Sequence, residues 1–133
     1  MISSKSFLFF FIIIPIFVFS QETTPFVTYD FHKDPIYKIK MLDLKKLEKK
    51  DPSIKTFISI ADLSYYFKDW EIAISYYEKI IVENPSAENY FKLAVAAARK
   101  SLEVSRFFSI TYVLKAKKSV LNAHRLAPKT LGI

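Results

Sequence analysis

The chain of 133 residues contains one glycine, six prolines and no cysteine, and it carries a formal net charge of +7. Its length fits one domain, since domains commonly hold about 100–200 residues. The lack of turn glycines argues against an all-β or α/β domain, and the lack of cysteine excludes disulfides and thiolate metal sites. Prolines separated by long glycine-free stretches are typical of boundaries between helices, so we expect an all-α fold.

The first 20 residues have the three parts of a secretory signal. Lys5 gives a positive start, an apolar run of 13 residues extends from Phe7 to Phe19, and Ser20 is a small residue at the expected cleavage point. The run contains Pro15 and is shorter than the roughly 20 apolar residues that a membrane-spanning helix needs. We expect a cleaved signal peptide and an exported protein, periplasmic or otherwise extracytoplasmic. The alternative is an uncleaved segment that anchors the protein.

Residues 21–35 are rich in charge and contain two prolines, which predicts an extended linker. We expect one helical domain over residues 36–133. Its first helix, over residues 36–50, is indicated by Asp34–Pro35, because an aspartate caps a helix start and proline fits the first helical position. Asp51–Pro52 repeats this combination and predicts the next boundary between helices.

Small and large residues recur at helical spacing from residue 54 to residue 129. Small residues let two antiparallel helices approach closely, and aromatic residues fill the groove beside them. Two sets of residues follow this order, one after the other. The first set is Phe57, Ile60, Ala61, Ala73, Tyr77 and Pro85, and the second is Tyr90, Leu93, Ala94, Ala116, Val120, Ala123 and Pro128.

The two sets resemble tetratricopeptide (TPR) repeats. The resemblance implies a short solenoid of helical hairpins with about five helices, in which residues 36–50 form a degenerate half-repeat. Pro85 and Pro128, which close the two units, are 43 residues apart, whereas the consensus repeat has about 34 residues. The extra residues, around 99–111, include neither glycine nor proline. We therefore expect them to lengthen both helices of the second hairpin.

A short array leaves its ends open, because each hairpin buries its apolar face only against the next. The linker aromatics, a second copy of the chain or a partner protein could cover them. The final helix has apolar residues on two faces, so either both are core or one is an interaction face. The first stripe is Phe107, Ile110, Leu114 and Leu121, and the second is Val113, Ala116, Val120, Ala123 and Ala127.

Basic residues gather at the C-terminal end of the chain. Residues 99–133 hold eight lysines and arginines against a single acidic residue, Glu103. This skew indicates an anionic partner, either an acidic protein or an anionic membrane surface. We expect no nucleic acid, because the chain lacks the signature motifs of nucleic-acid-binding folds and an exported protein seldom meets nucleic acid. A solvated basic surface without a partner is the remaining alternative.

The sequence contains no motif for catalysis. We find no glycine-rich phosphate loop, no nucleophile elbow and no HExxH metal motif, and His32 and His124 lie far apart. We therefore expect a protein that is not an enzyme and that has no cofactor and no metal. The resemblance to TPR proteins implies a groove for a peptide or helix. Tyr66, Trp70 and Tyr90 are candidate groove residues, and Lys115 and Lys118 are candidate charge contacts.

Two functions follow as hypotheses. The first is an exported TPR-like adaptor that binds another protein within an envelope complex. The second is a membrane-anchored structural protein whose basic C-terminal region lies against anionic lipid. Self-association through the open ends is compatible with both hypotheses.

Overall fold

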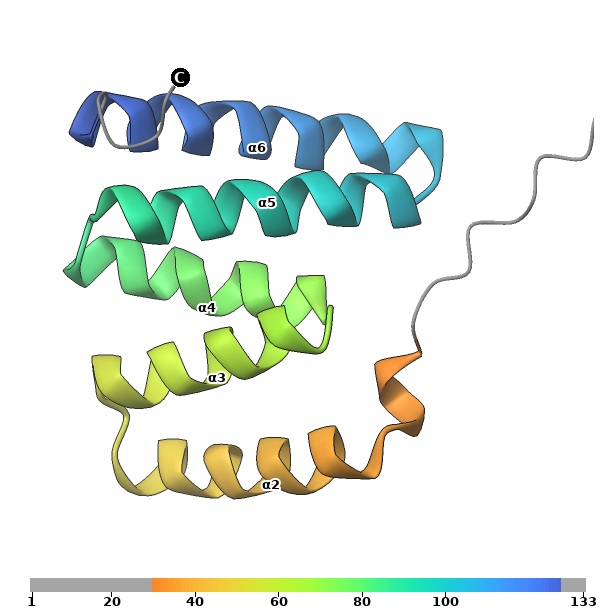
Figure 1. Ribbon diagram of the computed structural model, residues 1–133, viewed down its shortest axis with the longest axis vertical. Helices are drawn as coiled ribbons and strands as arrows, with labels where there is room; N and C mark the ends of the chain where they lie inside the picture. Colours follow the sequence, from red (N-terminus) through yellow and green to blue (C-terminus); the bar gives the residue numbers. More distant parts are fainter. Residues whose placement is uncertain (1–29, 128–133) are drawn as a thin grey trace, which may run out of the picture.

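The computed structural model describes residues 30–127, in which all regular elements are helices (Figure 1). The predicted signal segment, most of the predicted linker and Pro128 lie outside the described residues. The all-α prediction and the expected number of helices are confirmed for this range. The elements are the 3-10 helix η1 (Phe31–Lys33) and the α-helices α2 (Pro35–Lys50), α3 (Ile54–Tyr66), α4 (Trp70–Glu83), α5 (Ala87–Glu103) and α6 (Arg106–Leu126).

Short polar side chains begin most of these helices. The Asp34 carboxylate accepts a hydrogen bond of 2.9 Å from the N–H of Ile36 at the start of α2, as Asp34–Pro35 predicts. Asp69 caps α4 in the same way. The boundary expected at Asp51–Pro52 exists, but its cap is different. Asp51 follows the last turn of α2, and Ser53 caps α3.

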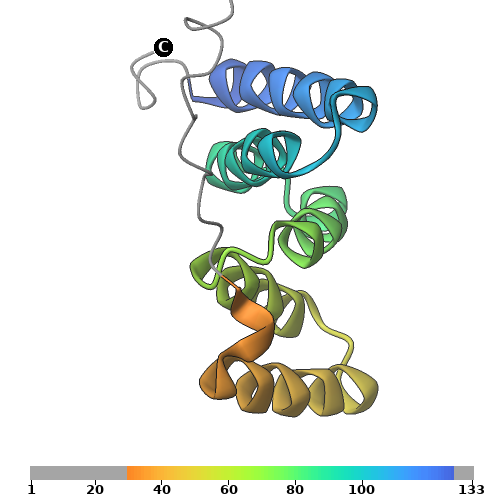
Figure 2. The ribbon, with the colours of Figure 1, turned by 90° about the vertical axis from the view of Figure 1, so that its right-hand side faces the viewer.

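The helices are stacked in chain order, and each packs against the one before it and the one after it (Figure 1). Seen end-on, α4 lies to one side of α3 and α5, so the stack is a zigzag of hairpins (Figure 2). The loop between α5 and α6 is only Val104 and Ser105. With 17 residues in α5 and 21 in α6, against 13 in α3 and 14 in α4, the extra residues lengthen both helices as predicted.

The core lies between α3, α4 and α5, and alanines allow its helices to approach closely. Ala61, Ala73 and Ala97 have no exposed surface, and the ring of Tyr77 is buried beside them. Among the repeat-defining residues, Ile60, Leu93, Ala94 and Ala123 are also buried, whereas Pro85 is exposed just after α4. These positions build the contacts between hairpins that their spacing predicted. The TPR assignment itself stays a prediction.

The predicted linker is folded where the structure describes it. Residues 31–33 form one turn of 3-10 helix against α2, and the ring of Phe31 meets the buried ring of Tyr37 edge-on at 5.4 Å between centroids. The Tyr37 hydroxyl donates a hydrogen bond to Asp69, the cap of α4. An aromatic residue of this segment therefore docks on the domain, and the end of the segment is not extended.

The tight turn between α3 and α4 has a lysine at the position that favours glycine. Lys68 has a φ of 64°. The N–H of Asp69 donates to the carbonyl of Ser64 at 2.8 Å, and the N–H of Lys68 donates to that of Tyr65 at 3.2 Å. These two bonds define a Schellman motif, whose left-handed residue is most often glycine because glycine has no Cβ.

Replacing Lys68 with glycine should stabilise the protein, by up to about 1 kcal/mol, because the left-handed backbone then carries no Cβ clash. The free energy of unfolding in urea measures the change. Lys46→Gly is the matched control, since Lys46 is an exposed lysine inside α2. That control should lose about 1 kcal/mol from the poor helix propensity of glycine. A loss of stability for Lys68→Gly would show that the turn does not hold this backbone.

Candidate protein-binding surface

Three of the candidate binding residues meet in one cleft. Tyr90 comes from α5, and Lys115 and Lys118 come from α6; together they line a cleft of about 370 Å³ between α4, α5 and α6. Side chains from all three helices complete the lining, with both apolar and polar groups. They are Glu78, Ile81, Leu93, Leu114, Ser119 and Asn122.

The two lysines of this cleft differ in their partners. The Lys115 ammonium is paired with the Glu78 carboxylate of α4, so this lysine joins α6 to α4. Lys118 is exposed and makes no ion pair with any residue of the described range. Lys118 is therefore the cation of this cleft that is available to an external carboxylate or phosphate group.

The structure separates the other two candidates from this cleft. Trp70 is a core residue with 8% of its surface exposed, and its ring meets Tyr65 edge-on at 5.5 Å. Tyr66 is 79% exposed and lies beside Phe67 at the turn that follows α3. The expectation that Tyr66, Trp70 and Tyr90 share one groove is not met, because the end of α3 and the start of α5 lie at different places in the stack.

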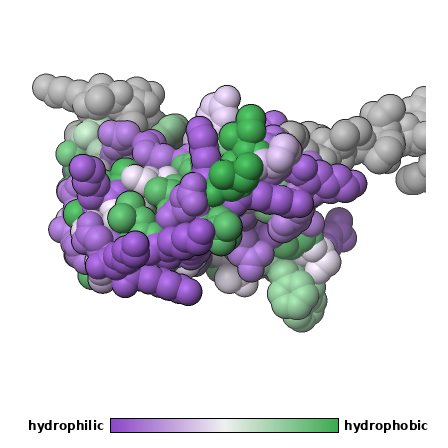
Figure 3. Space-filling view, turned by 90° about the horizontal axis from the view of Figure 1, so that it is seen from below, coloured by the Kyte–Doolittle hydropathy of each residue, from purple (hydrophilic) through white to green (hydrophobic). Residues whose placement is uncertain are grey.

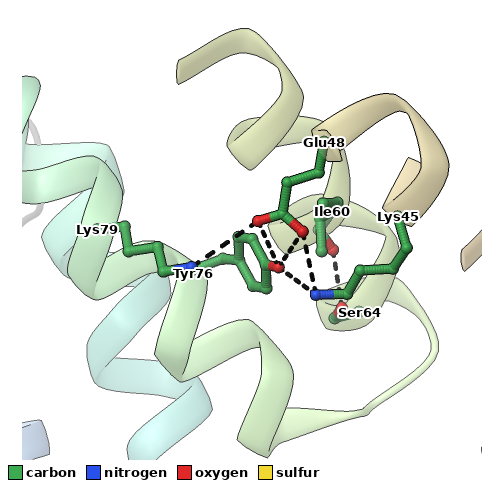
Figure 4. Close-up of polar contacts among 6 residues, drawn as sticks. All are labelled: Lys45, Glu48, Ile60, Ser64, Tyr76 and Lys79. Atoms are coloured by element: carbon green, nitrogen blue, oxygen red, sulfur yellow. Dashed lines mark hydrogen bonds and ion pairs between the residues drawn. The ribbon is translucent and has the colours of Figure 1, made fainter. Parts of the chain in front are cut away.

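A polar cluster connects α2 to α4 (Figure 4). The Tyr76 hydroxyl lies 2.8 Å from both carboxylate oxygens of Glu48, and the Lys45 ammonium contacts the Tyr76 hydroxyl and Glu48. Lys79 adds a contact of 3.8 Å to Glu48 and lies 4.4 Å from the centre of the Tyr76 ring. The groups satisfy one another, so we interpret the cluster as a structural bridge.

A similar polar bridge connects α3 to α4 and α5. The Asp62 carboxylate of α3 accepts hydrogen bonds from the Tyr77 hydroxyl at 2.7 Å and from the Lys92 ammonium of α5 at 3.1 Å. Both partners come from other helices, so we interpret Asp62 as a structural link from α3 to α4 and α5.

Sequence reasoning missed the bridges and several lining residues of the cleft. Glu78 and Ile81 come from α4, and no spacing within the sequence places them beside Lys115. The charges of the two helices are the sequence signal that could have indicated their contact. The helix α4 has three glutamates against one lysine, whereas α6 has five basic residues and no acidic residue. Attraction between these helices could have been anticipated from that difference.

No protein-family model, curated protein or solved structure matches the chain. Within residues 30–127, no group of three or more His, Cys, Asp or Glu side chains is placed to hold a metal ion. The helices of the same range are too short or too polar to cross a membrane.

The cluster around Glu48 predicts a loss of stability in acid. Burial opposes the charge of Glu48, but hydrogen bonds from Tyr76 and Lys45 outweigh burial and lower its pKa below the ordinary value of 4.5. A carboxyl with a lowered pKa contributes stability above its unfolded pKa, and this contribution is lost as the pH falls through the folded pKa. Between about pH 7 and about pH 3, the wild type should therefore lose more stability than Glu48→Gln. Urea unfolding at both pH values measures the difference.

The control is Glu83→Gln, since Glu83 is an exposed glutamate of α4 without an ion pair in the described range. This variant should keep the acid sensitivity of the wild type. Equal acid sensitivity of wild type and Glu48→Gln would show that the bridge does not hold the charge of Glu48.

Proposed function

We propose that the protein is an exported TPR-like adaptor that binds another protein within an envelope complex and has no catalytic role. The observation that carries the proposal is the cleft between α4, α5 and α6. Apolar side chains of Ile81, Leu93 and Leu114 lie there beside the hydroxyl-bearing ring of Tyr90 and the free ammonium of Lys118. Such a mixture suits a short segment of a protein, because apolar contacts give affinity and a charge fixes orientation.

The architecture supports the same proposal. Helical arrays of this kind bury each hairpin only against its neighbours, so their terminal helices keep an uncovered side. In α6 this side carries the exposed side chains of Phe107, Ile110, Leu114 and Leu121, which form the outward stripe. Exposed apolar surface of this extent is typical of a protein that works in contact with another molecule.

Crosslinking in cells tests the proposal. A C-terminally tagged full-length chain should recover one protein in near-equal amount when the envelope fraction is purified and analysed by mass spectrometry. Lys118→Glu should lower that recovery by about fivefold, because the variant removes the ammonium that can bind a carboxylate of the partner and puts a repulsive charge in its place. Lys55→Glu is the control with the same charge change on α3, where Lys55 is exposed and unpaired within the described range. Recovery of only the chain itself with lipid would contradict the adaptor function.

A membrane-anchored structural role is the second candidate, and α6 is the observation that favours it. This helix has five basic residues, no acidic residue and an exposed apolar stripe. Basic helices with an apolar side bind anionic lipid surfaces. In this role the N-terminal segment would stay attached and hold the chain at the membrane.

The mature N-terminus distinguishes the two candidates. The adaptor function predicts cleavage after Ser20, because the apolar run of 13 residues from Phe7 to Phe19 is that of a signal peptide. N-terminal sequencing of the protein isolated from its own cells should therefore begin at Gln21. A mature chain that begins at Met1 would favour the anchored structural role.

A further inference from the structure

The outward stripe of α6 is regular. Phe107, Ile110, Leu114 and Leu121 are spaced by three, four and seven residues, and between 58% and 88% of the surface of each is exposed. This spacing keeps the four side chains on one side of the helix over about 21 Å. It is also the spacing by which one helix packs along another. The opposite side of α6, which includes Ser119 and Ala123, is buried against the rest of the stack.

Equivalent positions of α4 and α6 indicate what would pack on this side of α6. The alignment that equates Ala73 with Ala116 also equates Glu71 with Leu114 and Glu78 with Leu121, since each pair is 43 residues apart. Both glutamates of α4 reach the following hairpin. Glu71 contacts Lys100 of α5 at 3.4 Å, and Glu78 pairs with Lys115 of α6. Leu114 and Leu121 therefore occupy the positions at which a next hairpin would dock on α6.

The charges beside the stripe select the chemistry of the occupant. Arg106 and Lys117 are exposed and form no ion pair within the described range, and Lys117 takes the position in the stripe between Leu114 and Leu121. No acidic side chain of α6 balances them. An occupant of this surface gains electrostatic energy if it carries carboxylates at the matching positions.

A second copy of the chain does not provide such a surface. The other end of the stack, α2, has six lysines against Asp43 and Glu48, and Glu48 is already engaged by α4. Figure 3 views the stack from this end, where exposed apolar side chains of α2 lie between hydrophilic ones. Pairing α6 with α2 or with another α6 would bring together helices that are both strongly basic, which costs free energy.

A helix fits this surface better than a bilayer does. A helix that lies on lipid carries its polar face on the side opposite its apolar face, whereas the opposite side of α6 is buried against the stack and Lys117 lies in the stripe itself. A partner helix can instead place a carboxylate opposite Lys117 and apolar side chains on either side of it. Resting on the proposed adaptor function, we propose that the outward side of α6 binds an acidic amphipathic helix of the partner protein, in the place of a next hairpin.

Site-specific photo-crosslinking in cells tests this proposal on the full-length chain. A benzoylphenylalanine at position 110 or 121, which are stripe positions outside the cleft, should attach to one protein, within a segment that combines apolar residues at a spacing of three and four with several aspartates or glutamates. The double variant Arg106→Glu/Lys117→Glu should lower the yield of this adduct by about tenfold, because both cations become repulsive. The matched control Lys38→Glu/Lys55→Glu changes two exposed lysines elsewhere and should leave the yield unchanged.

The other outcomes each overturn the inference. Adducts with lipid would assign the stripe to a membrane surface, and adducts with the chain itself would assign it to a second copy or to residues 1–29 or 128–133. A partner segment without acidic residues, or a yield insensitive to the double variant, would show that Arg106 and Lys117 do not pair with carboxylates of the partner. The same probe at Val82, which is 82% exposed on α4, should not capture the acidic segment. If the stripe gives no protein adduct while recovery still depends on Lys118, the adaptor function stands and only this inference fails.

Discussion

The structure depends on close contact between helices that are neighbours in the chain. Alanine makes that contact possible, because a larger side chain at Ala61, Ala73 or Ala97 would hold the helix axes apart. The aromatic and branched residues then fill the grooves on either side, as Tyr77 and Ile80 do with almost no exposed surface. The helix order, the zigzag and the uncovered terminal sides all follow from this one arrangement.

Hydrogen bonds and ion pairs between helices supplement this apolar packing. Lys45, Glu48 and Tyr76 connect α2 to α4, and Glu78 with Lys115 connects α4 to α6, so helices that are not consecutive are held on one side of the stack. Asp62 and Lys92 connect α3 to α5 in the same manner. The ion pairs are partly exposed and each contributes little to stability, whereas the hydrogen bonds of the buried Tyr76 and Tyr77 leave a polar group unsatisfied when they are lost. They fix the register that alanine contacts alone leave free.

Much of the fold could be predicted because its signals are local. Asp34–Pro35 and Asp69 indicate helix starts by a hydrogen bond within a few residues, and the absence of glycine and proline around 99–111 predicts longer helices. The candidate site was less predictable. Exposure of Tyr66, burial of Trp70 and the pairing of Lys115 with Glu78 depend on how helices distant in sequence pack together. Of the five candidates, the structure brings only Tyr90, Lys115 and Lys118 into one cleft, and the two lysines lie about one turn apart on the same helix.

The order of the stack also governs how the protein can assemble and come apart. Since contacts join consecutive helices, the contact order is low, and folding can nucleate in any hairpin and spread from it. Helix α6 has the most extensive interface in the stack, with α5, whereas α2 has the least extensive one between α-helices, with α3. Local opening should therefore begin at α2 while α3 to α6 remain together. A partner on the outward side of α6 would meet the better-packed end of the array, so binding there would cost little ordering of the protein.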